Sequence, residues 1–355
     1  MMRILVATDT WHPQFNGVLH SLLAQAAAAE SVGATFSFLN YEGLRTVALP
    51  HYPEIRLAIP GRTEIINRIE VARPDAIHIA TEGPIGYVVR RYCVQNAIPF
   101  TTSFHTRLPD YLSVRLPFPE SMVWACLRRY HAPSAGVFVA TQALAAELTA
   151  RGFRNVVVSP LGVDTELFRP RPGADLRLPR PVFLSAGRVA VEKNFEAFLK
   201  LKLPGTKVIV GDGPQREELS RRFPDTIFVG RQHGERLAQT FAAADVFVFP
   251  SLTDTFGLVL LEALASGTPV AAFPVAGPRD VIGRSPVGVL DDNLRLACMQ
   301  ALSLSREACR QYVLGMTWQQ SAQCFVTNVR ESIRKREATQ SGRLISRQSS
   351  LDAHV

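Results

Sequence analysis

The sequence lacks the features that define several common functional classes. Its five cysteines stand singly, with no Cys-x-x-Cys pair, so neither a zinc site nor a disulfide framework is predicted and a reducing compartment fits best. No Gly-x-Gly-x-x-Gly follows the first predicted strand, which disfavours an NAD-linked dehydrogenase. No Asp-x-Asp occurs in the chain. We therefore expect neither a metal ion nor any other cofactor.

Long apolar runs are missing as well. No window reaches about 18 uninterrupted apolar residues, so no membrane span is expected. The first residues run straight into a strand without a signal-peptide pattern, which predicts a cytoplasmic protein, free or peripheral on the inner face of the cytoplasmic membrane. The net charge is +8, and residues 330–355 carry six basic and three acidic side chains. This segment either contacts an anionic membrane or stays a solvated tail, and nucleic-acid binding is not expected.

What the chain does contain is a repeated alternation of short apolar strands and helical stretches. This alternation predicts an α/β fold with parallel sheets that are buried on both faces. Strands are predicted at 4–7, 35–39, 76–79, 100–103, 137–140 and 156–159 in the first half, and at 182–186, 207–210, 227–229, 246–250 and 270–273 in the second.

The length of 355 residues exceeds one ordinary core, so we predict two Rossmann-like doubly wound domains facing each other across a cleft. A Pro- and Arg-rich linker separates them, and a helix that packs back on the N-terminal domain precedes a disordered basic tail. The predicted boundaries, in that chain order, are 1–170, linker 171–181, 182–315, helix 316–336 and tail 337–355.

The most specific motif covers residues 250–270. A strand ends, a short loop follows, and a helix starts whose free N–H groups can bind an anion such as a diphosphate. Asp254 and Glu262 stand eight residues apart, so one carboxylate can reach a transferred sugar while the other holds the two ribose hydroxyls. The alternative is structural, with Asp254 as a helix cap and Glu262 facing solvent. The helix start itself contributes three candidate donor-binding residues: Phe256, Gly257 and Leu258.

A second motif, at residues 186–194, places Arg188 and Lys193 after a strand. Fixed cations stabilise the negative charge that a departing diphosphate gains, and a forked Arg contact with a point-charge Lys suits phosphate oxygens. Other strand-end residues are weaker candidates, because ordinary turns also place glycine and arginine there. They are Asn16 and Gly17 after the first strand, His105 after the fourth, and Gly213 and Arg231 in the second half.

The string at 250–270 resembles glycosyltransferase family 4, whose members have the two-domain GT-B fold and retain the anomeric configuration of the donor sugar. The resemblance implies that Glu262 binds the ribose, that Arg188 and Lys193 hold the diphosphate, and that the loop at Gly17 meets it. It further implies that His105 contacts the transferred sugar or the reaction centre, with front-face attack rather than a protein nucleophile. The position of Asp254 is usually Glu in the family, so the shorter Asp is a departure.

The stretches 52–60 and 75–84, with the His105 loop, look like a subgroup that glycosylates lipids. The resemblance implies a retaining transferase that moves a hexose-type sugar from a nucleotide-sugar donor, a UDP-sugar, to a lipid acceptor, diacylglycerol. Residues 121–131 read as a helix that either lies at a membrane interface or packs on the first domain. Open alternatives are a non-hydrolysing UDP-sugar epimerase, a transferase with a soluble or saccharide acceptor, and an inactive nucleotide-sugar-binding protein.

Overall fold

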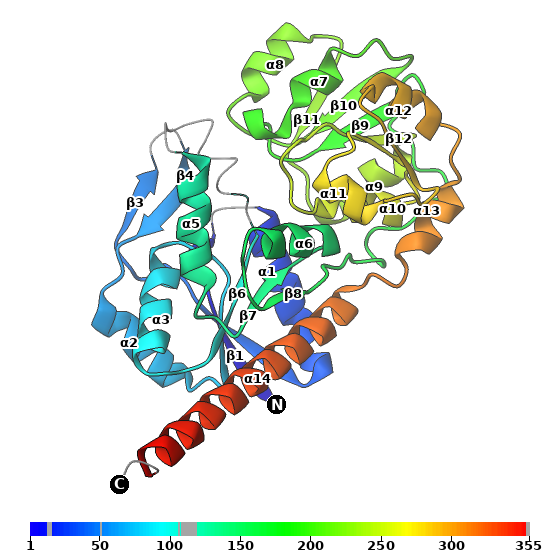
Figure 1. Cartoon of the computed structure of the whole chain (residues 1–355). Coiled ribbons are helices and arrows are strands. Elements are labelled where there is room, and N and C mark those ends of the chain that lie inside the picture. The colour runs from blue at the N-terminus through cyan, green and yellow to red at the C-terminus, as the bar shows by residue number, and fades with distance from the viewer. Residues whose placement is uncertain (13–15, 50–51, 106, 108–118, 353–355) are drawn as a thin grey trace. The chain divides into compact units, whose positions relative to one another are not determined.

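The computed structural model describes residues 1–12, 16–49, 52–105, 107 and 119–352. The chain forms two compact units: unit 1 is Met1–Pro160 with Ser321–Val355, and unit 2 is Leu161–Gln320. Each unit holds a six-stranded parallel sheet with helices on both faces (Figure 1). The predicted α/β class and the two Rossmann-like units are confirmed.

The sheet of unit 1 has the strand order β2-β1-β5-β6-β7-β8. Alternate residues of each strand serve opposite faces: in β1, Leu5 packs under one helical layer, whereas Ile4 packs under the other. The strands are β1 (Met2–Ala7), β2 (Ala34–Leu39), β5 (Ala76–Ile79), β6 (Phe100–Ser103), β7 (Gly136–Val139) and β8 (Val156–Val158).

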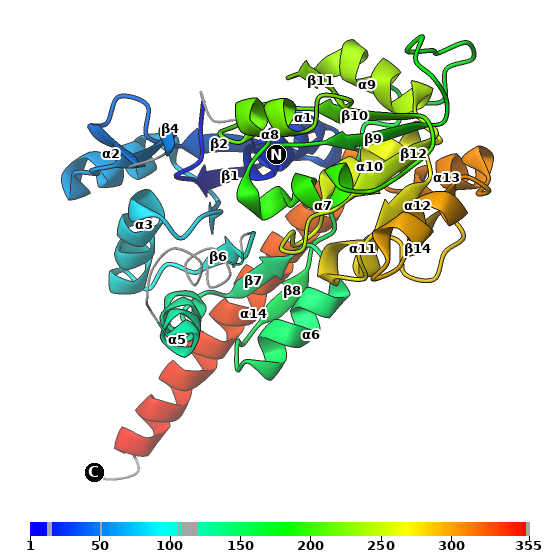
Figure 2. The ribbon, with the colours of Figure 1, turned by 90° about the horizontal axis from the view of Figure 1, so that it is seen from above.

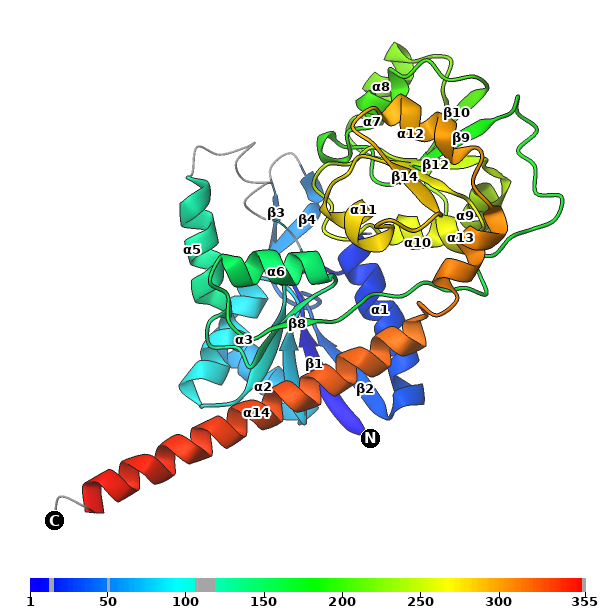
Figure 3. The same ribbon diagram turned by 45° about the vertical axis from the view of Figure 1, so that its right-hand side comes forward.

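The helices of unit 1 form two layers. The layer with α2, α3, α5 and α6 covers the Leu5 face, and α1 with α14 covers the other, as Figures 2 and 3 show. No helix in the described part of the chain is long and apolar enough to cross a bilayer. The helices are α1 (Gly17–Ala29), the 3₁₀ turn η1 (Glu30–Val32), α2 (Arg62–Ala72), α3 (Pro84–Gln95), α5 (Glu120–His131), α6 (Gln142–Ala150) and α14 (Trp318–Asp352).

A two-stranded antiparallel hairpin, β3 (Thr46–Leu49) and β4 (Tyr52–Ala58), was not predicted. It joins neither six-stranded sheet, and its strands are not buried on both faces. The exposed pair of Val47 and Leu57 faces each other across this hairpin.

Unit 2 has the strand order β11-β10-β9-β12-β13-β14. Helices α9, α10, α11 and α13 cover one face, and α7, α8 and α12 cover the other. The strands are β9 (Val182–Ala186), β10 (Thr206–Val210), β11 (Ile227–Gly230), β12 (Val246–Phe249), β13 (Val270–Ala272) and β14 (Gly288–Leu290). The helices are η2 (Val191–Lys193), α7 (Phe195–Leu199), α8 (Arg216–Arg222), α9 (Gly234–Ala243), α10 (Leu258–Ala265), α11 (Ala276–Val281), α12 (Leu294–Ala301) and α13 (Arg306–Val313).

Two boundaries differ from the expectation. Residues 161–181 belong to unit 2, because Val163 and Phe168 are buried in its core and Arg171 pairs with Glu235 at 2.9 Å. The tail expected to be disordered from 337 is helical as far as Asp352, since α14 continues without a break. A polar composition predicted disorder there, but residues 335–341 contain no proline and are mostly good helix formers.

Candidate active site

The polar residues of unit 2 gather at the point where its strand order reverses. Strands β9 and β12 are neighbours in the sheet although β10 and β11 lie between them in the chain, so their connections leave in opposite directions. In open α/β sheets, ligands bind beyond the carboxyl ends of the strands at such a point. The loops that follow β9 and β12 contain Arg188, Lys193 and Asp254.

Glycines allow the loops after β9 and β10 to lie against each other. The N–H of Gly187 donates to the carbonyl of Val210, and the N–H of Val189 donates to that of Asp212, each at 2.9 Å. A Cβ on Gly211 would lie 1.8 Å from the carbonyl oxygen of Gly187. Only glycine therefore fits there, and the backbone next to Arg188 is held in a fixed course.

Gly213 makes a similar close approach two residues further along the chain. A Cβ on it would lie 2.4 Å from the carbonyl oxygen of Val189, and its φ is +157°. Gly213 was a candidate donor-binding residue, and the structure shows in addition a packing requirement for it. Arg231 follows β11, which is two strands away from β9, and its side chain is exposed.

Lys193 and Asp254 form an ion pair across the switch point. The Lys193 Nζ lies 2.6 Å and 2.8 Å from the two carboxylate oxygens of Asp254, and the side chains are 27% and 17% exposed. The Asn194 amide donates to the carbonyl of Pro250 at 3.0 Å and ties the same two loops together. Asp254 therefore orients Lys193, and the proposed role of Asp254 as a helix cap is wrong: the cap position of α10 is Gly257.

The helix that follows begins where the sequence predicted. Gly257, at φ +86°, precedes α10, and this left-handed conformation favours glycine. The side chains of Phe256 and Leu258 are half-buried on either side of it. The first N–H groups of α10 follow the loop that carries Asp254, as a site for an anion requires.

Glu262 lies in the second turn of α10 and is 9% exposed, so the alternative that it faces solvent is wrong. Burial raises the pKa of its carboxyl from 4.5 to about 7. Among the residues that the structure describes, none donates a hydrogen bond to this carboxylate. A ligand hydroxyl can donate to this carboxylate in the place of water.

In unit 1, the three predicted residues lie at the carboxyl ends of other strands. Asn16 caps α1, because its Oδ1 accepts the N–H of Leu19 at 3.0 Å, and Gly17 is the first residue of that helix. Residues 13–15 of the same predicted loop lie outside the described residues. His105 follows β6, and burial lowers its pKa to about 4, so the imidazole is neutral at pH 7.

The helix expected either at a membrane or on the first domain is α5. Trp124 is 4% exposed, packs against Phe104 and Phe153, and lies under the Arg151 guanidinium at 4.1 Å. Leu127 is buried in the same cluster. These two apolar side chains belong to the core of unit 1, so they cannot contact a bilayer.

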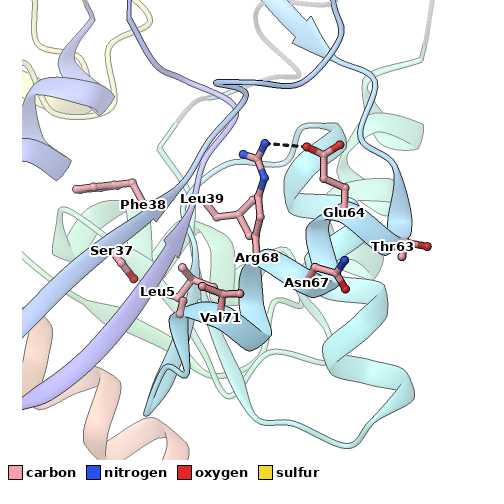
Figure 4. Close-up of a pocket in the computed structure, with 10 residues that line it drawn as sticks. Leu5, Ser37, Phe38, Leu39, Thr63, Glu64, Asn67, Arg68 and Val71 are labelled. Carbon is pink, nitrogen blue, oxygen red and sulfur yellow. Dashed lines mark hydrogen bonds and ion pairs between the residues drawn. The ribbon is translucent and has the colours of Figure 1, made fainter.

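A pocket of about 660 Å³ opens between β2 and α2 (Figure 4). Phe38, Leu39 and Val71 give it an apolar wall, and the ion pair of Arg68 with Glu64 at 2.8 Å closes one side. It contains none of the predicted site residues.

Comparison with solved structures identifies the class of fold. The chain superposes on sucrose-phosphate synthase from Thermosynechococcus elongatus with a TM-score of 0.74 at 20% identity, covering 99% of this chain and 100% of that one. It superposes on Anabaena HepE, solved in complex with UDP-glucose, with a TM-score of 0.63 at 17% identity, covering 96% and 100%. The fold is that of the GT-B glycosyltransferases.

Two family models then match consecutive parts of the chain: Glycosyltransferase Family 4 over residues 20–167 and Glycosyl transferases group 1 over residues 180–302. Both describe the glycosyltransferases that the motif at 250–270 resembles, and together they cover most of the sequence. The chain belongs to glycosyltransferase family 4.

Among its relatives is a sulfoquinovosyl transferase of Arabidopsis thaliana, 31% identical over 277 residues, which are 73% of this chain but only 54% of the plant protein. The chain thus spans about half the length of that relative. A GDP-mannose-dependent alpha-mannosyltransferase of Mycobacterium tuberculosis is 27% identical over 89% of this chain and 93% of its own length. An alpha-monoglucosyldiacylglycerol synthase of Streptococcus pneumoniae is 26% identical, with coverages of 93% and 85%. These names fit a lipid-glycosylating subgroup.

Proposed function

We propose that the protein is a retaining glycosyltransferase that moves a hexose-type sugar from a UDP-sugar to a lipid acceptor, diacylglycerol, at a membrane surface. The observation that carries the proposal is the buried Glu262 carboxylate, which has no donor among the described residues and follows the loop of the Lys193–Asp254 ion pair. A buried acceptor of this kind suits a vicinal diol, and a nearby cation suits a diphosphate. A nucleotide-sugar carries both groups.

The proposed roles in unit 2 follow the chemistry of the donor. Arg188 and Lys193 stabilise the diphosphate as the glycosidic bond breaks, and the N–H groups at Phe256, Gly257 and Leu258 add backbone donors. Gly213 and Arg231 flank the phosphates and the base. No metal ion takes part, because the two cations supply the positive charge, so activity should persist in excess EDTA.

In the same proposal, the acceptor hydroxyl attacks the face of the sugar that the phosphate leaves, and the departing phosphate takes its proton. Asp254 and His105 position the sugar, and His105 does so as a neutral imidazole. Asn16 and Gly17 bring the start of α1 to the diphosphate. The Asp254 carboxylate also fixes the ammonium of Lys193, so one ion pair links sugar positioning to phosphate stabilisation.

The lipid acceptor is supported by relatives whose names refer to sulfoquinovosyl transfer and to monoglucosyldiacylglycerol synthesis. A second candidate donor is GDP-mannose, because the mannosyltransferase relative aligns over nearly the whole length of both chains.

The experiment is a donor and acceptor screen with the purified full chain. UDP-glucose, UDP-galactose, UDP-glucuronate and GDP-mannose are each incubated with diacylglycerol vesicles, with and without EDTA, and products are identified by mass. A glycosyl-diacylglycerol formed from a UDP-sugar is the expected result. Transfer to a soluble sugar rejects the lipid acceptor, donor conversion without any acceptor favours an epimerase, and UDP binding without any turnover favours an inactive binding protein.

A further inference from the structure

Unit 1 has a switch point of its own, between β1 and β5, and two carboxylates lie at its carboxyl edge. Asp9 follows β1 and Glu82 follows β5. The mechanism proposed above uses neither of them, so the question is what each one binds.

Asp9 is fully engaged by the protein. Its two carboxylate oxygens accept the N–H groups of Ile85 and Gly86 at 2.8 Å and 3.2 Å and the Thr81 hydroxyl at 3.0 Å. Gly83 has no Cβ to block this approach, since one would lie 2.3 Å from the Asp9 carboxyl carbon. Asp9 therefore caps α3 and has a structural role.

Glu82 is held at one oxygen only. Its Oε1 lies 3.3 Å from Nε2 of His131, and the two side chains are 10% and 1% exposed. The other ring nitrogen, Nδ1, lies 2.9 Å from the Thr102 hydroxyl, which fixes the imidazole between β6 and Glu82. Within the described part of the chain, nothing donates to Oε2 of Glu82. One carboxylate oxygen is thus oriented by a buried histidine and the other is open to a ligand.

The charges at this edge select what that ligand can be. Burial is the main cause of the raised pKa of Asp9 and of Tyr130 and of the lowered pKa of His105, and the negative charge of Glu82 raises the pKa of all three groups. Two arginines of unit 1 have protein partners. Arg90 donates to the carbonyls of residues 129 and 130, and Arg107 pairs with Glu147 at 2.6 Å.

We propose that Glu82, positioned by His131, binds the reacting end of the acceptor through a hydroxyl group, and that the Glu82 carboxylate selects acceptors without a phosphate beside that hydroxyl. A carboxylate accepts a hydroxyl hydrogen bond and repels a phosphate, and the adjacent Asp9 adds to that repulsion. This inference rests on the proposed glycosyl transfer and narrows its acceptor to a neutral polyol or glycerolipid end. Glu82 is a binding residue and His131 a positioning residue.

The experiment uses the purified full chain with four acceptors and the donor found by the screen. Two acceptors are neutral, dioleoylglycerol in vesicles and methyl glucoside, and two carry phosphate, phosphatidylinositol in vesicles and inositol 3-phosphate. Glu82→Gln keeps the shape and removes the charge. Glu64→Gln, on the exposed face of α2, is the matched control. UDP affinity reports the donor site independently.

We expect Glu82→Gln to lower kcat/KM for the neutral acceptor by about ten- to a hundredfold, mainly through KM, because a hydrogen bond to a charged group is lost. UDP affinity should stay within about twofold, and the preference for neutral over phosphate acceptors should shrink. His131→Phe should behave like Glu82→Gln, and His131→Gln, which keeps a donor near Nε2, should recover part of the loss. If His131→Phe fails to fold, the kinetics of Glu82→Gln still test whether Glu82 binds the acceptor.

Equal kinetics of Glu82→Gln and Glu64→Gln would overturn the inference, as would a wild-type preference for a phosphate acceptor. Transfer to methyl glucoside but not to dioleoylglycerol, with the loss in Glu82→Gln, would reject the lipid acceptor and leave this inference standing. No transfer to any of the four would overturn both.

Discussion

At the switch point of unit 2, a lysine and an aspartate pair across two loops, and the next helix buries a glutamate that no described residue satisfies. At the switch point of unit 1, one carboxylate caps a helix and the other rests against a buried histidine. The two edges therefore differ in their charged groups. Unit 2 has Lys193 and Arg188 as well as the carboxylates of Asp254 and Glu262, whereas the groups named at the edge of unit 1 are carboxylates and the neutral imidazole of His105.

The difference shows how two units of the same architecture can bind different substrates of one reaction. Both sheets place ligands beyond their strand ends, so the fold sets where chemistry occurs but not which chemistry. The side chains that follow β9 and β12 suit a diphosphate. Glu82, which follows β5, suits a neutral hydroxyl.

The largest effect on this comparison is expected when the Lys193 cation of unit 2 is removed. Lys193→Ala should lower kcat by about 30- to 1,000-fold, a loss on the order of 2–4 kcal/mol of transition-state stabilisation. Steady-state kinetics with the screened donor measures it. Lys193→Arg, which keeps the charge beside Asp254, should retain more activity than Lys193→Ala.

A purely structural ion pair would behave differently. Lys193→Ala leaves Asp254 without its partner, so the variant is compared with Lys193→Met/Asp254→Leu, which removes both charges. If that double variant recovers near-normal kcat along with stability, the cation has no role in turnover.

Glu262→Gln tests the other half of the unit 2 site. Loss of the charged acceptor should raise KM for the donor by about tenfold or more, because a hydrogen bond to a charged group contributes about 1.5–3 kcal/mol. A variant whose donor KM and UDP affinity match those of the wild type would contradict the ribose assignment.

The same variant should be more stable than the wild type at high pH. The folded-state pKa is raised to about 7, so the fold favours the protonated carboxyl, and ionisation costs stability as pH rises from about 4.5 to 7. Gln cannot ionise. Its advantage in melting temperature should therefore be small at pH 5 and largest at pH 8, with an upper bound on the order of 3 kcal/mol.

The features that were predicted best from the sequence are the strands that are buried on both faces of a sheet. β5 and β6 were predicted with their observed bounds and are buried throughout, although β5 contains His78 and three of the four residues of β6 are polar. β14 was missed because one of its three residues is Gly288, whereas β8 and β13 have the same length but consist of valine and alanine. The β3–β4 hairpin was missed because its strands are not buried on both faces.

Contacts between side chains that are far apart in the chain could not be predicted from the sequence. Lys193 and Asp254 are 61 residues apart and were each assigned a role, but nothing local shows that they touch. His131 and Glu82 are 49 residues apart, and Glu82 was seen only as part of a family-like string. Its place directly after a strand was the signal that could have singled it out.

A comparison of two glycine substitutions tests how rigidly the loops after β9 and β10 are held together. Gly211→Ala should destabilise the protein by about 1–3 kcal/mol more than Gly173→Ala, since both have positive φ but only Gly211 meets backbone, at 1.8 Å. Urea unfolding of the two variants measures this difference. Equal midpoints would mean that the loops after β9 and β10 move apart at little cost.

The smallest effect is expected at His105 in unit 1, in the pH dependence rather than the rate. Its pKa of about 4 keeps the imidazole neutral across pH 5–8, so its proton cannot produce a step in kcat/KM there. His105→Asn should change the height of the pH–rate profile but not its shape between pH 5 and 8. If the wild-type profile had a limb near pH 6.5 that disappeared in the variant, His105 would titrate in the working range. The neutral character assigned to the unit 1 edge would then be wrong.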